Sequence, residues 1–278
     1  MKISEIISSL KNNIKKLTNH LLCCQARFTS ETNVNEPAEE SEALTTEAFY
    51  VQRTTSPSPH YLGGPTLHSG SECPECGREV TLTWDLDLTA PDIPATLKGG
   101  YGSLQRLPLY VCSQCSVLSY QVLADDKIAC FPHGDLDWCF DNESPHYETR
   151  PEIQRQPIRL YPMSPEIDAL WKKHHYLYNQ ESLDDLESAQ LQGYFDSLDV
   201  APDDLDDYSQ LCGDPYWIQR SRTSDCPNPQ CKAGATTKRL AHISPTDSPG
   251  LGDSIGYFNF QFMACPACFS ISVQYECT

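Results

Sequence analysis

Cys73-Pro74-Glu75-Cys76 and Cys112-Ser113-Gln114-Cys115 form one set of four cysteines, and Cys226, Cys231 and Cys265-Pro266-Ala267-Cys268 form a second. Two short cysteine pairs separated by a few dozen residues are typical of a tetrahedral zinc site with four thiolate ligands. Each short pair turns the chain so that two thiolates point at the same metal ion. We therefore predict two structural Zn2+ ions, one held by Cys73, Cys76, Cys112 and Cys115, the other by Cys226, Cys231, Cys265 and Cys268.

The two quartets have a common spacing. Cys226, Cys265 and Cys268 each lie 153 positions after their counterparts in the first quartet, which are Cys73, Cys112 and Cys115. An alternating run of apolar and polar residues follows each quartet, at 118–122 and at 269–275, and predicts a half-buried strand. A further strand is expected over Trp84–Leu88. We infer two copies of one β-rich module.

The predicted fold class is α+β and β-rich, with two repeated zinc-ribbon-like β modules, an N-terminal amphipathic helix and a helical acidic connector. The expected parts are the amphipathic helix 1–27, a flexible acidic linker 28–59, zinc-knuckle β module one 60–160, the helical acidic connector 161–211, and zinc-knuckle β module two 212–278. Ser164-Pro165-Glu166 has the pattern of a helix start, and Trp171 in that helix is expected to be a core residue.

The N-terminal segment has apolar residues at helical spacing with lysines between them, at Ile3, Ile6, Ile7, Leu10, Ile14, Leu17 and Leu21. Packing on the body or on a partner, or binding at a membrane surface, would each suit such a helix. Lys15-Lys16 interrupts the apolar centre that a secretory signal needs. The chain has no run of about eighteen apolar residues, so no transmembrane segment is predicted. Cysteine pairs without a signal indicate a reducing, cytoplasmic location.

The net charge of −18 is concentrated in one part of the chain. Residues 124–211 contain 6 Lys or Arg and 20 Asp or Glu, whereas residues 212–278 contain 5 of each. In segment 124–211, aspartates occur in the pairs Asp184-Asp185, Asp203-Asp204 and Asp206-Asp207. A solvated linker and a binding surface for a basic protein both explain such a run, and the sequence leaves both open. We take these six aspartates as candidate partner-binding residues.

The predicted chemistry of the quartets is structural. Four thiolates complete a tetrahedral zinc site and leave no position for water or substrate. The sequence contains no phosphate-binding loop, nucleophile elbow or metalloprotease motif, so we expect a protein that is not an enzyme. Cys130, His133, Cys139 and His146 have the residue types of a third site, but their loose spacing favours ordinary buried or exposed residues over a site.

Several motifs around the quartets resemble those of the bacterial YwqG-like proteins and, more distantly, of eukaryotic programmed cell death protein 2. In module two these are Gly213-Asp214-Pro215-Tyr216-Trp217-Ile218-Gln219, the two cysteine pairs and Gly252-Asp253-Ser254-Ile255-Gly256-Tyr257. Module one carries Leu62-Gly63-Gly64-Pro65, the 84–88 strand and Tyr110-Val111-Cys112. The resemblance covers about half of the chain, and segment 232–238 departs from it by lacking an apolar strand start.

The resemblance implies a β-rich fold and a protein-binding role, as a chaperone for a ribosomal protein or as an immunity protein against a toxin. We therefore expect a zinc-stabilised adaptor that captures a basic protein through its acidic surface. The alternative is a nucleic-acid-binding protein that uses Arg220, Arg222, Lys232, Lys238 and Arg239 with Tyr216, Trp217, Phe258 and Phe260. The net charge of −18 disfavours nucleic acid because it repels phosphate.

Overall fold

Short runs rich in leucine, valine and aromatic residues build the strands of this protein, as their preference for a pleated, buried surface predicts. The computed structural model describes residues 44–115, 117–132, 153–175, 183–198, 209–213, 225–244 and 258–277. The strands are β1 (Ala48–Arg53), β2 (His60–Leu62), β3 (Thr81–Asp87), β4 (Arg106–Val111), β5 (Val117–Ala124), β6 (Lys127–Phe131), β7 (Gln156–Met163), β8 (Ser209–Cys212), β9 (Lys238–Ile243), β10 (Phe258–Ala264) and β11 (Ile271–Cys277). The helices are α2 (Ala95–Gly100), α3 (Pro165–His175) and α4 (Asp185–Asp196).

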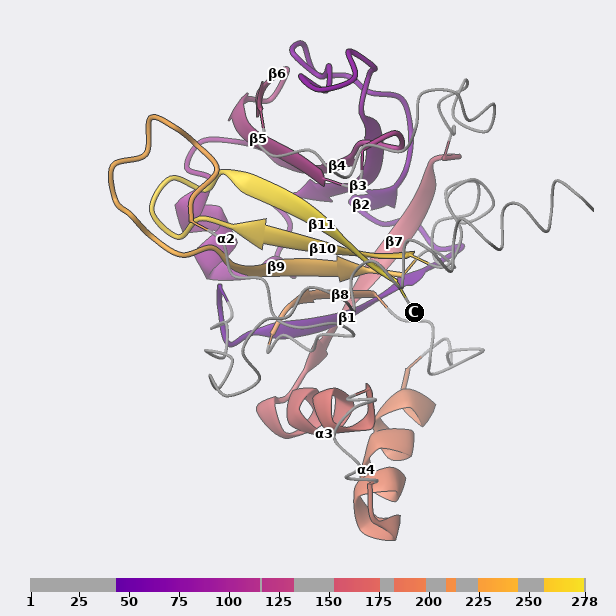
Figure 1. Ribbon diagram of the computed structural model, residues 1–278. Helices are drawn as coiled ribbons and strands as arrows, with labels where there is room; N and C mark the ends of the chain where they lie inside the picture. Colours follow the sequence, from indigo (N-terminus) through magenta and orange to yellow (C-terminus); the bar gives the residue numbers. More distant parts are fainter. Residues whose placement is uncertain are drawn as a thin grey trace, which may run out of the picture. The chain divides into compact units, whose positions relative to one another are not determined.

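These strands form one eleven-stranded sheet in the order β4-β3-β2-β7-β1-β8-β9-β10-β11-β5-β6 (Figure 1). The pairs β1–β7, β1–β8 and β9–β10 are antiparallel. The sheet is curled, so that β5, near one end of the strand order, lies close to β4 at the other end. The Tyr120 hydroxyl of β5 donates to the Pro108 carbonyl of β4 at 3.1 Å and accepts from the Tyr110 N–H at 3.0 Å. A β-rich α+β fold was predicted, and the structure has it.

Strands from both halves of the chain share this sheet. β5 comes from predicted module one and β11 from predicted module two, and they pair with Ile271 opposite Tyr120 and Gln274 opposite Val117. The described residues up to 276 belong to a single compact unit. The boundaries predicted at 60–160 and 212–278 therefore do not separate two independent sheets, because each half supplies a pairing partner to the other.

The linker predicted over 28–59 has to be corrected where the structure describes it. Ala48 to Arg53 form β1, which lies between β7 and β8, and Ala48, Phe49, Tyr50 and Val51 are all buried. The linker was predicted from the glutamates that dominate the composition of the segment. Four consecutive apolar residues after them are the pattern of a strand that is buried on both faces of a sheet. The predicted helix 1–27 and residues 28–43 lie outside the described residues.

Helices α3 and α4 pack on the same sheet face as Tyr50 of β1 and Tyr161 of β7. Trp171 of α3 is 1% exposed, and its ring lies 4.8 Å from that of Phe195 in α4 and 6.2 Å from that of Tyr50. The helix start at Ser164-Pro165 and the core position of Trp171 are confirmed. Among the described helices, none has the length and apolar character that crossing a membrane requires.

Candidate metal centres

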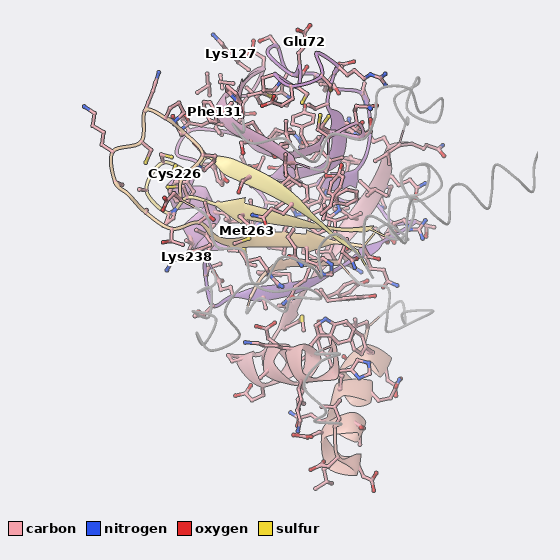
Figure 2. The ribbon with its side chains drawn as sticks, in the orientation of Figure 1. Glu72, Lys127, Phe131, Cys226, Lys238 and Met263 are labelled. Atoms are coloured by element: carbon pink, nitrogen blue, oxygen red, sulfur yellow. The ribbon has the colours of Figure 1, made fainter. Side chains whose placement is uncertain are left out.

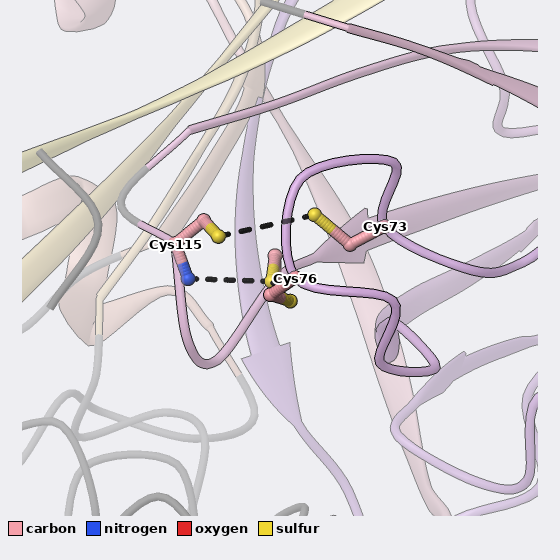
Figure 3. A group of neighbouring side chains, drawn as sticks. Cys73, Cys76 and Cys115 are labelled. Carbon is pink, nitrogen blue, oxygen red and sulfur yellow. Dashed lines mark hydrogen bonds between the residues drawn. The ribbon is translucent and has the colours of Figure 1, made fainter. Parts of the chain in front are cut away.

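The first cluster joins two turns of the sheet. Cys73 and Cys76 lie in the segment between β2 and β3, and Cys112 directly follows β4, with Cys115 at the end of the same turn. The Sγ atoms of Cys73 and Cys115 are 3.9 Å apart (Figure 3). Those of Cys76 and Cys112 are 3.6 Å apart. All four Sγ atoms lie within 4.8 Å of one another.

The second cluster is built in the same way from the other half of the chain. Cys226 and Cys231 lie ahead of β9, while Cys265 and Cys268 form the turn between β10 and β11. The Cys226 and Cys268 sulfur atoms are 3.3 Å apart, and all four lie within 4.8 Å of one another. Figure 2 shows Cys226 at this end of the sheet, with Lys238 and Met263 on the neighbouring strands β9 and β10.

One turn in each cluster has the same backbone hydrogen bonds. In the first, the Cys73 N–H donates to the Arg78 carbonyl and the Gly77 N–H donates to the Cys73 carbonyl, both at 2.8 Å. In the second, the Cys265 N–H donates to the Ser270 carbonyl at 2.9 Å, and the Phe269 N–H donates to the Cys265 carbonyl at 2.8 Å. The residue after each turn has a left-handed φ, 68° at Gly77 and 56° at Phe269.

The longer pair, Cys226 and Cys231, is shaped by Asn228. The Asn228 side-chain oxygen accepts from the Gln230 N–H at 2.9 Å, and its backbone carbonyl accepts from the Cys231 N–H at 2.9 Å. Such an asparagine turn folds the chain back locally. The two extra residues of this loop are thereby accommodated without separating the two thiols.

The geometry and chemistry of both clusters fit a bound metal ion. Zinc–sulfur bonds of 2.3 Å in a tetrahedron place sulfur atoms about 3.8 Å apart, close to the separations observed here. All eight cysteines are free thiols. In the first cluster Cys73, Cys112 and Cys115 are buried, as is Cys265 in the second. Each cluster can hold one metal ion, and four sulfur ligands fill a tetrahedral shell.

Each cluster contains a thiol that ionises near neutral pH. Hydrogen bonds with the Cys112 and Cys115 side chains lower the pKa of the Cys73 thiol to about 7. Burial opposes ionisation of Cys268, but hydrogen bonds with the side chain and backbone of Ser270 lower the pKa of its thiol to about 7. Thiolates are the metal-binding form of cysteine, so these groups favour binding at neutral pH.

Two histidines near the first cysteine pair have partners other than sulfur. His60 is fully buried; its Nδ1 accepts from the Asp87 N–H, and its Nε2 lies 3.1 Å from an Asp92 carboxylate oxygen. The His68 Nδ1 lies 2.6 Å from the Tyr110 hydroxyl. Both side chains therefore tie loops to the sheet.

The third candidate site is described only at Cys130. Its thiol lies on β6, 3.5 Å from the Gly70 carbonyl, and burial raises its pKa to about 12. His133, Cys139 and His146 lie outside the described residues, so their convergence stays a prediction.

Two of the six candidate partner-binding aspartates are described, and they begin α4. The Asp184 carboxylate accepts from the backbone N–H groups of Leu186 and Glu187, at 2.9 and 2.8 Å, and so caps the helix. Asp185 is exposed in the first turn. Asp203, Asp204, Asp206 and Asp207 lie outside the described residues.

The residues proposed for nucleic-acid contact are divided between surface and core. Lys232 is exposed, but Arg239 is fully buried, where its guanidinium donates to the Gln210 side chain and to the Cys212 carbonyl. Phe260 is also fully buried. Neither buried residue can stack on a base or reach a phosphate. Arg220, Arg222, Tyr216 and Trp217 lie outside the described residues, as does the side chain of Phe258.

Four residues around the clusters carry contacts that sequence reasoning missed: Gln121, Asn228, Phe269 and Tyr275. The strand pattern identified the segments of Gln121 and Tyr275, but which carbonyl each reaches depends on strand pairing.

Neither a family model nor a curated protein matches the chain.

Proposed function

We propose that this chain is a protein-binding protein whose sheet is stabilised by two zinc ions and whose acidic α4 surface captures a basic partner. The observation that carries the proposal is the arrangement of α4, which is anchored on one side by buried residues and has exposed aspartates at both ends. The two closed four-cysteine clusters support the stabilising part of it.

Zinc is the metal that the ligand set favours. Soft thiolate ligands in a tetrahedral arrangement select zinc over the hard cations magnesium and calcium. A site with four protein ligands has no open position for a reacting water. The role that follows is structural: each ion ties two turns of the sheet together.

Helix α4 is held firmly by its inner side. Leu191 and Phe195 are buried against Trp171, and the Lys173 ammonium of α3 contacts the Glu187 carboxylate at 2.8 Å. Asp184 and Asp185 at the start of the helix and Asp196 at its end are all exposed. Leu186, next to Asp185, is 82% exposed.

This exposed surface suits a basic protein segment with an apolar side chain. Residues 183–198 contain no lysine or arginine, so every charged side chain of this segment is negative. An acidic surface attracts a cationic partner and sets its orientation, and an exposed leucine adds apolar contact area. The resemblance to YwqG-like proteins and to programmed cell death protein 2 favours the same class of role, with a ribosomal protein or a toxin as the partner.

The test is affinity capture from native lysate with nuclease treatment, followed by binding measurements on each captured protein after purification. Wild type is compared with the double variant Asp184→Asn, Asp185→Asn. Asparagine is as good a helix cap as aspartate, so the variant removes charge and keeps α4. We expect affinity for a basic partner to fall on the order of tenfold, mostly through slower association, and to weaken with salt.

The matched control is Glu72→Gln with Glu79→Gln, which removes the same charge at two exposed residues outside α4 (Figure 2 labels Glu72). The control is expected to bind like wild type. Equal affinity of the α4 variant and wild type would contradict capture through this surface. Ribonucleoproteins that are lost on nuclease treatment would favour the nucleic-acid alternative instead.

A further inference from the structure

The pair of strands β5 and β11 connects the two four-cysteine clusters. β5 begins two residues after Cys115, and β11 begins three residues after Cys268. Because the two strands are antiparallel, with Ser272 opposite Ser119, each one leads away from its own cluster toward the other. The end of each strand can therefore contact the cluster that it does not follow in sequence.

Gln121 of β5 makes this contact with the second cluster. Its side-chain N–H donates to the Cys268 carbonyl at 2.8 Å, and its side-chain oxygen accepts from the Asn228 side chain at 3.1 Å. Cys268 lies in one turn of that cluster and Asn228 in the other. One side chain from the first half thus holds both turns of the second metal site.

Tyr275 of β11 makes the reciprocal contact with the first cluster. Its hydroxyl donates to the carbonyl of Cys112, at 2.5 Å, and the ring is buried with its centroid 4.7 Å from that of Phe260. A buried hydrogen bond of this kind is lost at a cost if either partner moves. The position of the Cys112 turn therefore depends on β11 being in place.

Helix α2 adds a third contact between the halves. The Phe269 ring, directly after Cys268, lies 5.1 Å from the Tyr101 ring. A Cβ at Gly100 would lie 2.0 Å from two carbon atoms of the Phe269 ring, so this approach needs glycine. The turn that carries Cys265 and Cys268 is thus seated on a helix of the first half.

We propose that the two four-cysteine sites bind metal cooperatively, with Gln121 and Tyr275 as the connecting side chains. Metal at one site orders the turns of that site and the strand that follows them. That strand carries the side chain, Gln121 or Tyr275, that hydrogen-bonds to a cysteine carbonyl of the other site. Coupling of this kind is reciprocal, so each ion raises the affinity for the other by the same factor. The inference rests on the metal-binding part of the proposed function and is independent of partner capture.

The experiment is a zinc titration of the metal-free, reduced full chain, with native mass spectrometry to count molecules that hold zero, one or two ions. Independent sites, equal or unequal, leave at least half of the molecules with one ion when the mean occupancy is one. For two sites of equal intrinsic affinity, tenfold coupling lowers that fraction to about one quarter. We expect wild type to fall clearly below one half.

The test variant is Gln121→Ala with Tyr275→Phe, and Tyr275→Phe is also made alone because it removes only a hydroxyl. Both are expected to bind two ions at saturation, with the singly loaded fraction returning toward one half. The control, Gln192→Ala with Tyr194→Phe, removes similar hydrogen bonds in α4, where Gln192 contacts Asp196 and the Tyr194 hydroxyl donates to the Tyr161 carbonyl. It should titrate like wild type.

Each other outcome has a separate meaning. A wild type that binds two ions, with half or more of its molecules singly loaded and with the same fraction in the Gln121→Ala, Tyr275→Phe variant, has no coupling through these side chains, which overturns the proposal and leaves the metal sites standing. A wild type that is cooperative, with equally cooperative variants, overturns the role of Gln121 and Tyr275. Fewer than two ions at saturation would refute the two-zinc assignment in the proposed function as well.

Discussion

Phe269 occupies the left-handed position of a cysteine turn, where glycine stands in the other cluster. A left-handed backbone costs a residue with a Cβ roughly 1–2 kcal/mol, and Gly77 avoids that cost. At Phe269 the cost is offset by the contact of its ring with Tyr101 and Gly100. The same backbone turn is therefore compatible with different residues, according to what lies beside it.

His242 makes the stability of the fold depend on pH. Burial lowers its pKa to about 3, assisted by the positive charge of Arg239. The unfolded chain takes up a proton below the ordinary value of 6.5, but the folded chain does so only near 3. Stability is therefore lost as the pH falls through this window, by about 1 kcal/mol from His242 alone at pH 5.5.

The measurement is urea unfolding of wild type and His242→Gln at pH 7.5 and pH 5.5. Glutamine cannot be protonated, so the variant is expected to lose about 1 kcal/mol less than wild type between the two values. Loss of thiolate ligands affects both proteins equally and cancels in the comparison. Equal losses would show that His242 titrates normally in the folded chain.

At the scale of elements, the first turn of α4 depends on Asp184. This residue forms a capping box with Glu187, whose carboxylate accepts from the Asp184 N–H at 2.9 Å. Asp184→Ala is expected to lower the free energy of unfolding by about 1 kcal/mol, whereas Asp184→Asn should leave it nearly unchanged. Chemical denaturation of both variants checks this, and similar losses would mean that charge, not capping, is the stabilising feature.

Cap and charge have different consequences for binding at the same residue. A partner that recognises charge is weakened equally by Asp184→Asn and Asp184→Ala. A partner that needs an ordered helix is weakened more by Asp184→Ala. For this reason the capture experiment uses asparagine.

At the scale of the whole molecule, each cluster joins two turns that lie next to different strands of one sheet. Removal of metal leaves four thiols crowded within 4.8 Å at each site, with no ion to hold the turns together. Because structural zinc contributes directly to folding, a chelator with reductant is expected to lower the Tm by on the order of 10 °C or more. Thermal unfolding with zinc content measured in parallel tests this.

Addition of zinc should restore the Tm, and magnesium should not, because magnesium prefers oxygen ligands. An unchanged Tm in protein shown to be free of metal would argue against a stabilising role. Acid is expected to act in the same direction as the chelator, since protonated thiols do not bind metal.

Local pattern in the sequence was sufficient to identify the two cysteine clusters. A short cysteine pair forms a turn through bonds within six residues, as the Cys73–Arg78 and Cys265–Ser270 segments show. The strands β3, β5 and β11 and the start of α3 were also predictable, because alternation and helix caps act over a few residues. The β-rich class followed from these features.

Only the tertiary structure decided how the parts combine. β1 lies inside the sheet because its four apolar residues are covered on both faces by segments distant in sequence, which composition cannot indicate. Arginine is a residue type that usually lies at the surface. Arg239 is nevertheless in the core, where its guanidinium donates hydrogen bonds to the Gln210 side chain and to the Cys212 carbonyl. The contacts from Gln121 to Cys268 and from Tyr275 to Cys112 depend on the pairing of strands about 150 positions apart. Pairing over such distances is determined by the burial of all the elements together, so no local pattern in the sequence records it.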